Sequence, residues 1–202
     1  MNMNTESEDL DKSTKFGRRT LVRWFLGIGA VSSLSALGSV FATVKPRSQQ
    51  ANPEIQAGDP LVFALGANKG EPVERTSILP GQAVLAFPSG KEMQENLIMV
   101  FHLHPEDLME PTRLDWTPEG FVAYSAICTH LGCTVNFSHD PMEGAPYPHI
   151  HCPCHAGLFN PQAGAQVVGG PPPRPLPQLP LKLTADGGLV AAGPFEVPVG
   201  AV

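Results

Sequence analysis

Four cysteines and two histidines in the second half of the chain have the residue types and the spacing of metal ligands or disulfide cysteines. They lie in two short motifs, Cys128-Thr-His130-Leu-Gly-Cys133 and Cys152-Pro-Cys154-His155. Thiolates and imidazoles are common ligands of zinc and iron, and paired cysteines also form disulfides. The motifs therefore indicate a region that is cross-linked, binds a metal, or does both.

Three interpretations of these six residues are open. Four cysteines can form two disulfides in three ways, but this leaves His130 and His155 without a role. Zinc accepts two thiolates and two imidazoles in a tetrahedral site, and it does not require Cys133 or Cys154. An iron–sulfur cluster held by two thiolates and two imidazoles, with the other two cysteines paired, uses every residue of the set.

The two motifs, followed by Gly170-Pro171-Pro172, together resemble those of Rieske iron–sulfur proteins. The resemblance is specifically to the [2Fe–2S] subunit of bacterial cytochrome bc complexes, which are quinol:cytochrome c oxidoreductases. It implies one [2Fe–2S] Rieske cluster as the cofactor and metal centre. The matching positions are the ligands Cys128 and Cys152 on one iron, the ligands His130 and His155 on the other, and the disulfide pair Cys133 and Cys154.

The same resemblance implies an activity. Two imidazoles in place of thiolates raise the cluster potential to about −150 to +300 mV, which allows electron uptake from a quinol. His155, with His130 beside it, is expected to be the catalytic residue that meets the quinol and couples electron uptake to a proton. Leu131 and the loop 170–172 are expected to cover the cluster and form an apolar docking tip. The implied partners are cytochrome b, a c-type cytochrome subunit and the quinol.

One departure from the family's pattern bears on the potential. Many high-potential members carry a serine and a tyrosine after the second histidine, and their hydroxyls hydrogen-bond to cluster or cysteine sulfur. Here Gly157 and Phe159 occupy those positions and bring no hydroxyl. Because hydrogen bonds to sulfur stabilise the added electron, we expect a potential on the lower side of the family's range, which would suit menaquinol.

The N-terminal part of the chain has the pattern of a membrane anchor. Residues 24–44 are 21 positions without a charge, and at about 1.5 Å per residue such a helix spans roughly the 30 Å of a bilayer core. Five lysines or arginines precede it, which places the tail 1–23 in the cytoplasm. Residues 17–23 also resemble a twin-arginine export signal. We expect a single-pass protein of the bacterial inner membrane, with its Rieske domain on the periplasmic or outer face.

Residues 46–202 differ sharply in composition from the N-terminal part of the chain. Residues 46–202 hold all 22 prolines and 15 of the 19 acidic residues, against seven basic ones, so this part carries about −8 and is not expected to bind nucleic acid. A flexible linker is expected at 45–60. Short β-like runs between turns then predict an all-β, Rieske-type β-sandwich over 61–202, with a small cluster-binding subdomain at about 126–175. The predicted strands are Leu61–Gly66, Ala83–Phe87, Leu97–His102, Phe121–Ile127, Thr134–Phe137, Ala165–Val168, Leu181–Leu183 and Leu189–Ala192.

Two other functions are compatible with the sequence. The chain could be the small Rieske subunit of a molybdenum enzyme such as arsenite oxidase, which would also use the twin-arginine route. It could instead be a non-catalytic exported domain, stabilised by zinc or disulfides, that binds a partner. Metal analysis with an electron paramagnetic resonance (EPR) spectrum of the reduced protein separates this non-catalytic domain from the two Rieske functions. Molybdenum or b-type haem then separates the molybdenum enzyme from the cytochrome bc complex.

Overall fold

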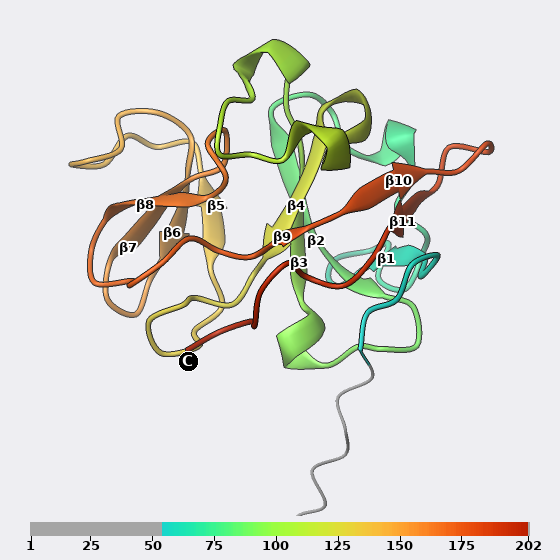
Figure 1. The fold of residues 1–202 in the computed structure, drawn as a ribbon, viewed down its shortest axis with the longest axis horizontal. Coiled ribbons are helices and arrows are strands. Elements are labelled where there is room, and N and C mark those ends of the chain that lie inside the picture. Colours follow the sequence, from blue (N-terminus) through green and yellow to red (C-terminus); the bar gives the residue numbers. More distant parts are fainter. Residues whose placement is uncertain (1–53, 202) are drawn as a thin grey trace, which may run out of the picture. The chain divides into compact units, whose positions relative to one another are not determined.

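The computed structural model describes residues 54–201 (Figure 1). They form eleven short strands and five 3₁₀ turns. The strands are β1 (Leu61–Phe63), β2 (Gln82–Pro88), β3 (Ile98–His102), β4 (Phe121–Ser125), β5 (Asn136–Ser138), β6 (His149–Cys152), β7 (Gly157–Asn160), β8 (Gln166–Gly169), β9 (Gln178–Leu179), β10 (Leu181–Leu183) and β11 (Leu189–Ala191). The turns are η1 (Arg75–Ser77), η2 (Gln94–Asn96), η3 (Pro105–Asp107), η4 (Leu114–Trp116) and η5 (Pro118–Gly120).

The strands pair into three antiparallel sheets. The largest has the order β1-β2-β3-β4-β9, the second β5-β6-β7-β8, and the third is the hairpin β10-β11. In Figure 1 the four-stranded sheet lies on one side of the five-stranded sheet and the hairpin on the other. The prediction of an all-β domain is confirmed. The helix predicted at 24–44 lies outside the described residues, and no helix within 54–201 is long and apolar enough to cross a bilayer.

Strands β3 and β4 are buried on both faces and separate two hydrophobic cores. Successive side chains point to opposite faces of a strand. Met99 and Phe101 of β3 therefore enter one core, which they share with Phe159 of the four-stranded sheet. Ile98 and Val100 enter the other core, which is completed by side chains of β10 and β11. The central sheet is thus fixed from both sides and provides a firm base for the four-stranded sheet.

Strands β6, β7 and β9 are absent from the predicted set. Cys152 ends β6 and Gly157 begins β7, and the two residues pair across the hairpin, so the Cys-Pro-Cys-His motif interrupts the β pattern. Strand β9 lies within the proline-rich stretch 169–180. It sits at the edge of its sheet and pairs with β4 alone, which is the position where neighbouring prolines are tolerated.

The domain includes residues 54–60, which were predicted from the sequence to belong to the linker; residues 45–53 lie outside the described part. Ile55 is 3% exposed and belongs to the second core. The Lys91 ammonium donates to the Glu54 carbonyl at 2.8 Å and to the Asp59 carboxylate at 2.6 Å. Burial alone would raise the pKa of Asp59, but Lys91 and the Gln56 amide outweigh it and hold the pKa below 3.8. The stabilisation from the ionised Asp59 carboxylate is therefore present above pH 3.8. It is lost as the pH falls through the lowered pKa of Asp59.

Lys91→Met should release the segment 54–59 from the domain, because Lys91 holds both Glu54 and Asp59. We expect about fivefold faster cleavage at Glu54 by a glutamate-specific protease at neutral pH, since a partly exposed ion pair contributes about 1 kcal/mol. Mass spectrometry of the full-length protein identifies the cut. Lys69→Met removes an exposed lysine elsewhere and should leave the rate unchanged. Equal rates in both variants would show that Ile55 alone anchors the segment.

Candidate metal centre

The first motif forms a tight loop between β4 and β5. The Cys128 amide donates to the Cys133 carbonyl at 2.8 Å, and the Gly132 amide donates to the Cys128 carbonyl at 3.0 Å. Gly132 has φ 79°, a left-handed conformation that glycine adopts without a Cβ penalty. These bonds close the loop on itself and leave Leu131 at its tip, 64% exposed.

The second motif forms the turn of the β6–β7 hairpin. Cys152, at the end of β6, is 2% exposed, whereas Cys154 and His155 on the turn are exposed. Ala156 completes the turn at φ 52°, an uncommon value for a residue with a Cβ. The hairpin thus directs one cysteine inward and carries the other cysteine and the histidine at the surface.

A disulfide between Cys133 and Cys154 joins the two loops, with their Cα atoms 6.6 Å apart. This is the pairing that the resemblance implied. Cys128 and Cys152 remain as free, buried thiols, so the structure does not contain two disulfides. The sulfur atoms of Cys133, Cys152 and Cys154 lie within 4.8 Å of one another. Two of these three are consumed by the disulfide, so the available thiol ligands are Cys128 and Cys152.

The two free thiols are both buried, in an environment that suits a bound cation. Cys128 and Cys152 are 1% and 2% exposed. Burial, with a smaller contribution from the neighbouring Cys152 thiol, raises the pKa of the Cys128 thiol to about 11. Metal ligation requires thiolates. A buried pair of thiols of this kind therefore fits a bound metal centre, whose positive charge stabilises both thiolates.

The two histidines of the motifs lie together at the same end of the loops. The rings of His130 and His155 are 4.7 Å apart between centroids and meet edge to face at 89°. His130 Nδ1 is buried and makes no hydrogen bond to any residue in 54–201. This nitrogen belongs to the first motif and is available as a ligand atom. Two thiols, an inward imidazole nitrogen and a second imidazole fit the donor set of a [2Fe–2S] cluster with mixed ligands.

The proline-rich loop is seated directly on these two ligand loops. Gly170 has φ 78°, and a Cβ there would lie 2.4 Å from the Ala156 carbonyl oxygen, so only glycine allows this close approach. Pro172 is buried, whereas Gly170 and Pro171 are exposed. The structure thus brings Leu131 and the loop 170–172, the residues predicted to cover the cluster, around the two motifs.

One contact of this loop was missed by sequence reasoning. The Thr129 hydroxyl, between the first cysteine and the first histidine, donates to the Arg174 carbonyl at 2.7 Å. Thr129 is 1% exposed. A threonine and an arginine separated by 45 positions carry no pattern that predicts their contact.

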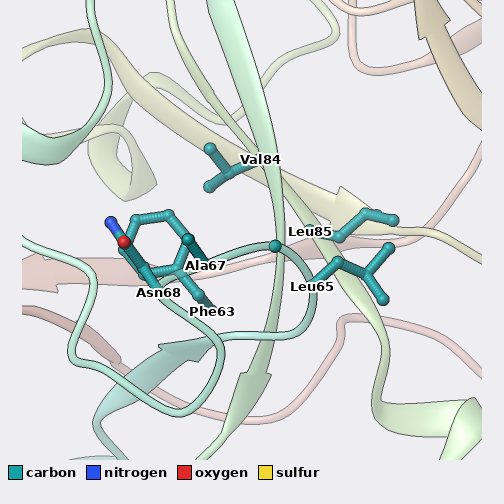
Figure 2. A pocket seen from close by; sticks show the side chains of 7 residues that line it. Phe63, Leu65, Ala67, Asn68, Val84 and Leu85 are labelled. Carbon is teal, nitrogen blue, oxygen red and sulfur yellow. The ribbon is translucent and has the colours of Figure 1, made fainter.

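Other histidines and grooves of the domain do not join this centre. His149 is fully buried, and its Nδ1 donates to the Tyr147 carbonyl at 2.8 Å. Figure 2 shows a separate apolar groove at β1 and β2, lined by side chains that include Phe63, Leu65 and Val84. None of the motif cysteines or histidines lines it. Metal-centre chemistry is therefore concentrated at the two joined loops.

Comparison with known proteins agrees with this geometry. Residues 87–180 match the model of the Rieske [2Fe–2S] domain family. A Rieske subunit assigned to a respiratory nitrate reductase of Haloferax mediterranei is 31% identical over 94% of this chain and 83% of its own length. The cytochrome bc1 complex Rieske iron–sulfur subunit of Streptomyces lividans is 34% identical over 66% of this chain and 81% of its own.

Two further similarities cover most of the chain. The cytochrome bc1 complex Rieske iron–sulfur subunit of Streptomyces coelicolor is 31% identical over 94% of this chain, which corresponds to 54% of that subunit. A chain from a solved hyperthermophilic respiratory Complex III is 28% identical, covers 82% of this chain and 98% of its own, and has a TM-score of 0.40. The family match, the relatives and the joined Cys–His loops together establish that this chain belongs to the Rieske [2Fe–2S] family and carries one [2Fe–2S] cluster.

Proposed function

We propose that this chain is the electron-transfer subunit of a membrane-bound quinol:cytochrome c oxidoreductase, with Cys128, Cys152, His130 and His155 as the cluster ligands. When bound, a Rieske cluster supplies a one-electron acceptor at a potential that two neutral imidazoles raise. The observation that carries the proposal is the opposite exposure of the two ligand pairs. The thiols are buried, while His155 is exposed and His130 partly so, and only the imidazole side is accessible to a quinol.

His155 is the residue placed to exchange a proton with a bound quinol. It lies on the exposed hairpin turn, where a quinol hydroxyl can reach the ring nitrogen that is not a ligand. The ring nitrogen that does not bind iron can carry a proton and exchange it with the quinol. His130 turns its Nδ1 inward, so any proton that it exchanges is held at Nε2.

An apolar rim around the histidines supports docking on a membrane partner. Leu131 projects from the first loop and is 64% exposed, and Pro171 is exposed on the proline loop. Exposed apolar groups beside a functional site mark surfaces of interaction. We assign this rim to contact with cytochrome b, where a quinol would be held between the two subunits, and later contact with a c-type cytochrome.

The proposal includes the membrane topology expected from the sequence. Residues 1–23 would form a cytoplasmic tail with the twin-arginine signal, and 24–44 a single anchor in the inner membrane. The Rieske domain would then lie on the periplasmic or outer face. The names of the Streptomyces relatives support membership of a cytochrome bc1 complex.

A second candidate is supported by the similarity to the Haloferax protein. That protein is assigned to a respiratory nitrate reductase, and the match extends over 94% of this chain. In such a complex, the same cluster and ligand loops would pass electrons toward a different terminal acceptor. The host complex therefore has to be identified directly.

The experiment that tests the proposal is purification of the tagged full-length protein from its native membranes in mild detergent. Co-purification of b-type and c-type haem, together with quinol-dependent cytochrome c reduction, is the expected result. Nitrate reduction by the purified complex, without cytochrome c reduction, would assign the chain to the second candidate. Molybdenum without b-type haem and without nitrate reduction would favour another molybdenum enzyme.

The surroundings of Cys152 bear on the expected potential. Gly157 is buried, and a Cβ built on it would lie 2.6 Å from Pro172 Cγ and 3.3 Å from Cys152 Cβ. Pro172 therefore fills the space where a longer side chain could approach the ligand thiol. Phe159 is fully buried in the first core and brings no hydroxyl. Both features remove hydrogen-bond donors from the vicinity of sulfur, which disfavours the reduced state.

We expect the midpoint potential to lie on the lower side of the Rieske range, in keeping with oxidation of menaquinol. An EPR-monitored redox titration of the full-length protein at pH 7 measures it. A value as high as that of ubiquinol-oxidising members, measured side by side, would contradict the expectation.

Gly157→Ala should displace the proline loop, because the new methyl group would overlap Pro172. Overpacking of this kind costs about 1–3 kcal/mol, so we expect a lower unfolding temperature and faster loss of iron from the protein. Differential scanning calorimetry and iron analysis provide the two readouts. Gly193→Ala is the matched control, since its Cβ would lie 3.4 Å from Pro180 Cγ in ordinary contact.

The ligand assignment predicts which histidines are needed to hold iron. His155→Ala and His130→Ala should each abolish the visible absorbance and the EPR signal of the cluster. His151→Ala, one residue before Cys152, should retain both, because His151 is not among the proposed ligands. Loss of the cluster in His151→Ala, or its retention in either of the other two variants, would contradict the ligand assignment.

A further inference from the structure

Arg174 stands out among the charged residues of the cluster-binding region. It is the only lysine or arginine between Arg113 and Lys182, the segment that contains both motifs and the proline loop. Its guanidinium is folded inward rather than extended into solvent: Nη2 donates to the Pro198 carbonyl at 2.7 Å and to the Gly200 carbonyl at 2.8 Å. Arg174 thus binds the last residues of the described chain.

The C-terminal strap, residues 195–201, reaches the first ligand loop. Val199 packs against the core that contains Cys128 and Cys152. Gly200 is buried, and a Cβ on it would lie 3.5 Å from Cγ2 of Ile127, the residue before Cys128. In Figure 1 the C-terminal end lies beside the loop that follows β4. The strap therefore supports the loop that carries the first two ligands.

Arg174 also contacts that loop through its backbone. Its carbonyl accepts the hydrogen bond from the Thr129 hydroxyl, and Thr129 separates Cys128 from His130 in the sequence. One residue thereby joins three segments: the strap through its side chain, the first ligand loop through its carbonyl, and the proline loop to which it belongs.

The charge of Arg174 has no counter-charge within residues 54–201. It forms none of the ion pairs found in this part of the chain. Its Nε and Nη1 are buried and make no hydrogen bond to the described residues. A partly buried cation without a carboxylate favours negative charge nearby, and the strap that Arg174 holds lies against Ile127, the residue before the ligand Cys128.

We propose that Arg174 is a positioning residue that fastens the C-terminal strap and the proline loop to the first ligand loop, and that its unpaired positive charge raises the reduction potential of the cluster. A positive charge near the cluster stabilises the reduced, more negative form. The inference depends on the cluster but not on the proposed quinol reaction.

The test uses the full-length holoprotein and compares Arg174→Met, which removes charge and hydrogen bonds, with Arg174→Lys, which keeps the charge but lacks the planar fork. Redox titration at low ionic strength measures the potential. Hydrogen–deuterium exchange measures the strap. We expect a lower potential in R174M and a near-normal one in R174K. Amides of residues 195–201 should exchange at least about tenfold faster in R174M, the factor expected for losing a hydrogen bond to a charged group, and by an intermediate factor in R174K.

Arg75→Met is the control for charge alone. Arg75 pairs with Glu119 at the surface at 3.3 Å, so its loss changes the net charge equally without touching the strap. It should change neither the potential nor the exchange. An unchanged potential in R174M, or wild-type exchange in the strap of both Arg174 variants, would overturn the proposal. If R174M does not accumulate with its cluster, hydrogen–deuterium exchange of R174K decides the positioning role. Thr129→Val keeps the charge of Arg174 but removes the hydrogen bond to the Arg174 carbonyl, and it should alter the EPR g-values.

Discussion

The disulfide between Cys133 and Cys154 is the constraint on which the metal centre depends. The two ligand loops arise from different strand connections, and each is held at its own base by only a few backbone hydrogen bonds. A cross-link over a separation of 21 residues lowers the entropy of the unfolded chain by an amount worth about 3 kcal/mol. It also removes two of four sulfurs from competition for metal. What remains are two buried thiols and two imidazoles, so the cross-link selects the ligand set as well as holding it.

The fold supplies a firm base for these loops. Because β3 and β4 are buried on both faces, the central sheet cannot shift without disturbing two cores at once. Tyr124 of β4 shows how polar groups are accommodated there: its ring is fully buried, and its hydroxyl donates to the Pro161 carbonyl at 3.0 Å. Pro161 follows directly after β7, so this bond connects the central sheet to the hairpin that carries the second motif. The hairpin of the second motif is therefore anchored to the strands that both cores enclose.

The sequence predicted the chemistry of the site better than its surroundings. The cysteines and histidines form short local motifs, and their residue types restrict which metal centres they can bind. The cluster and the disulfide could therefore be predicted from the resemblance of these motifs to a known family. Strands β6 and β7 were missed because the Cys-Pro-Cys-His turn interrupts their alternation. Strand β9 was missed because prolines surround it, and only its place at the sheet edge makes it possible. The strap and Arg174 could not be predicted, since their contacts connect distant positions that share no pattern.

The structure also suggests why a domain with few hydroxyl donors near its sulfurs could still hold a usable potential. Pro172 fills the space beside Gly157, and this packing leaves no room for a side-chain donor at that position next to Cys152. Taken alone, these losses would leave the reduced cluster poorly stabilised. Arg174, the only lysine or arginine of this region, is joined to the loop of Cys128 through its carbonyl and to the strap through its guanidinium. In the role proposed for Arg174, its charge and the missing hydrogen bonds near Cys152 act on the reduction potential in opposite directions. Pro172 and Arg174 belong to the same proline-rich loop, so we expect this loop to determine the balance of the two effects.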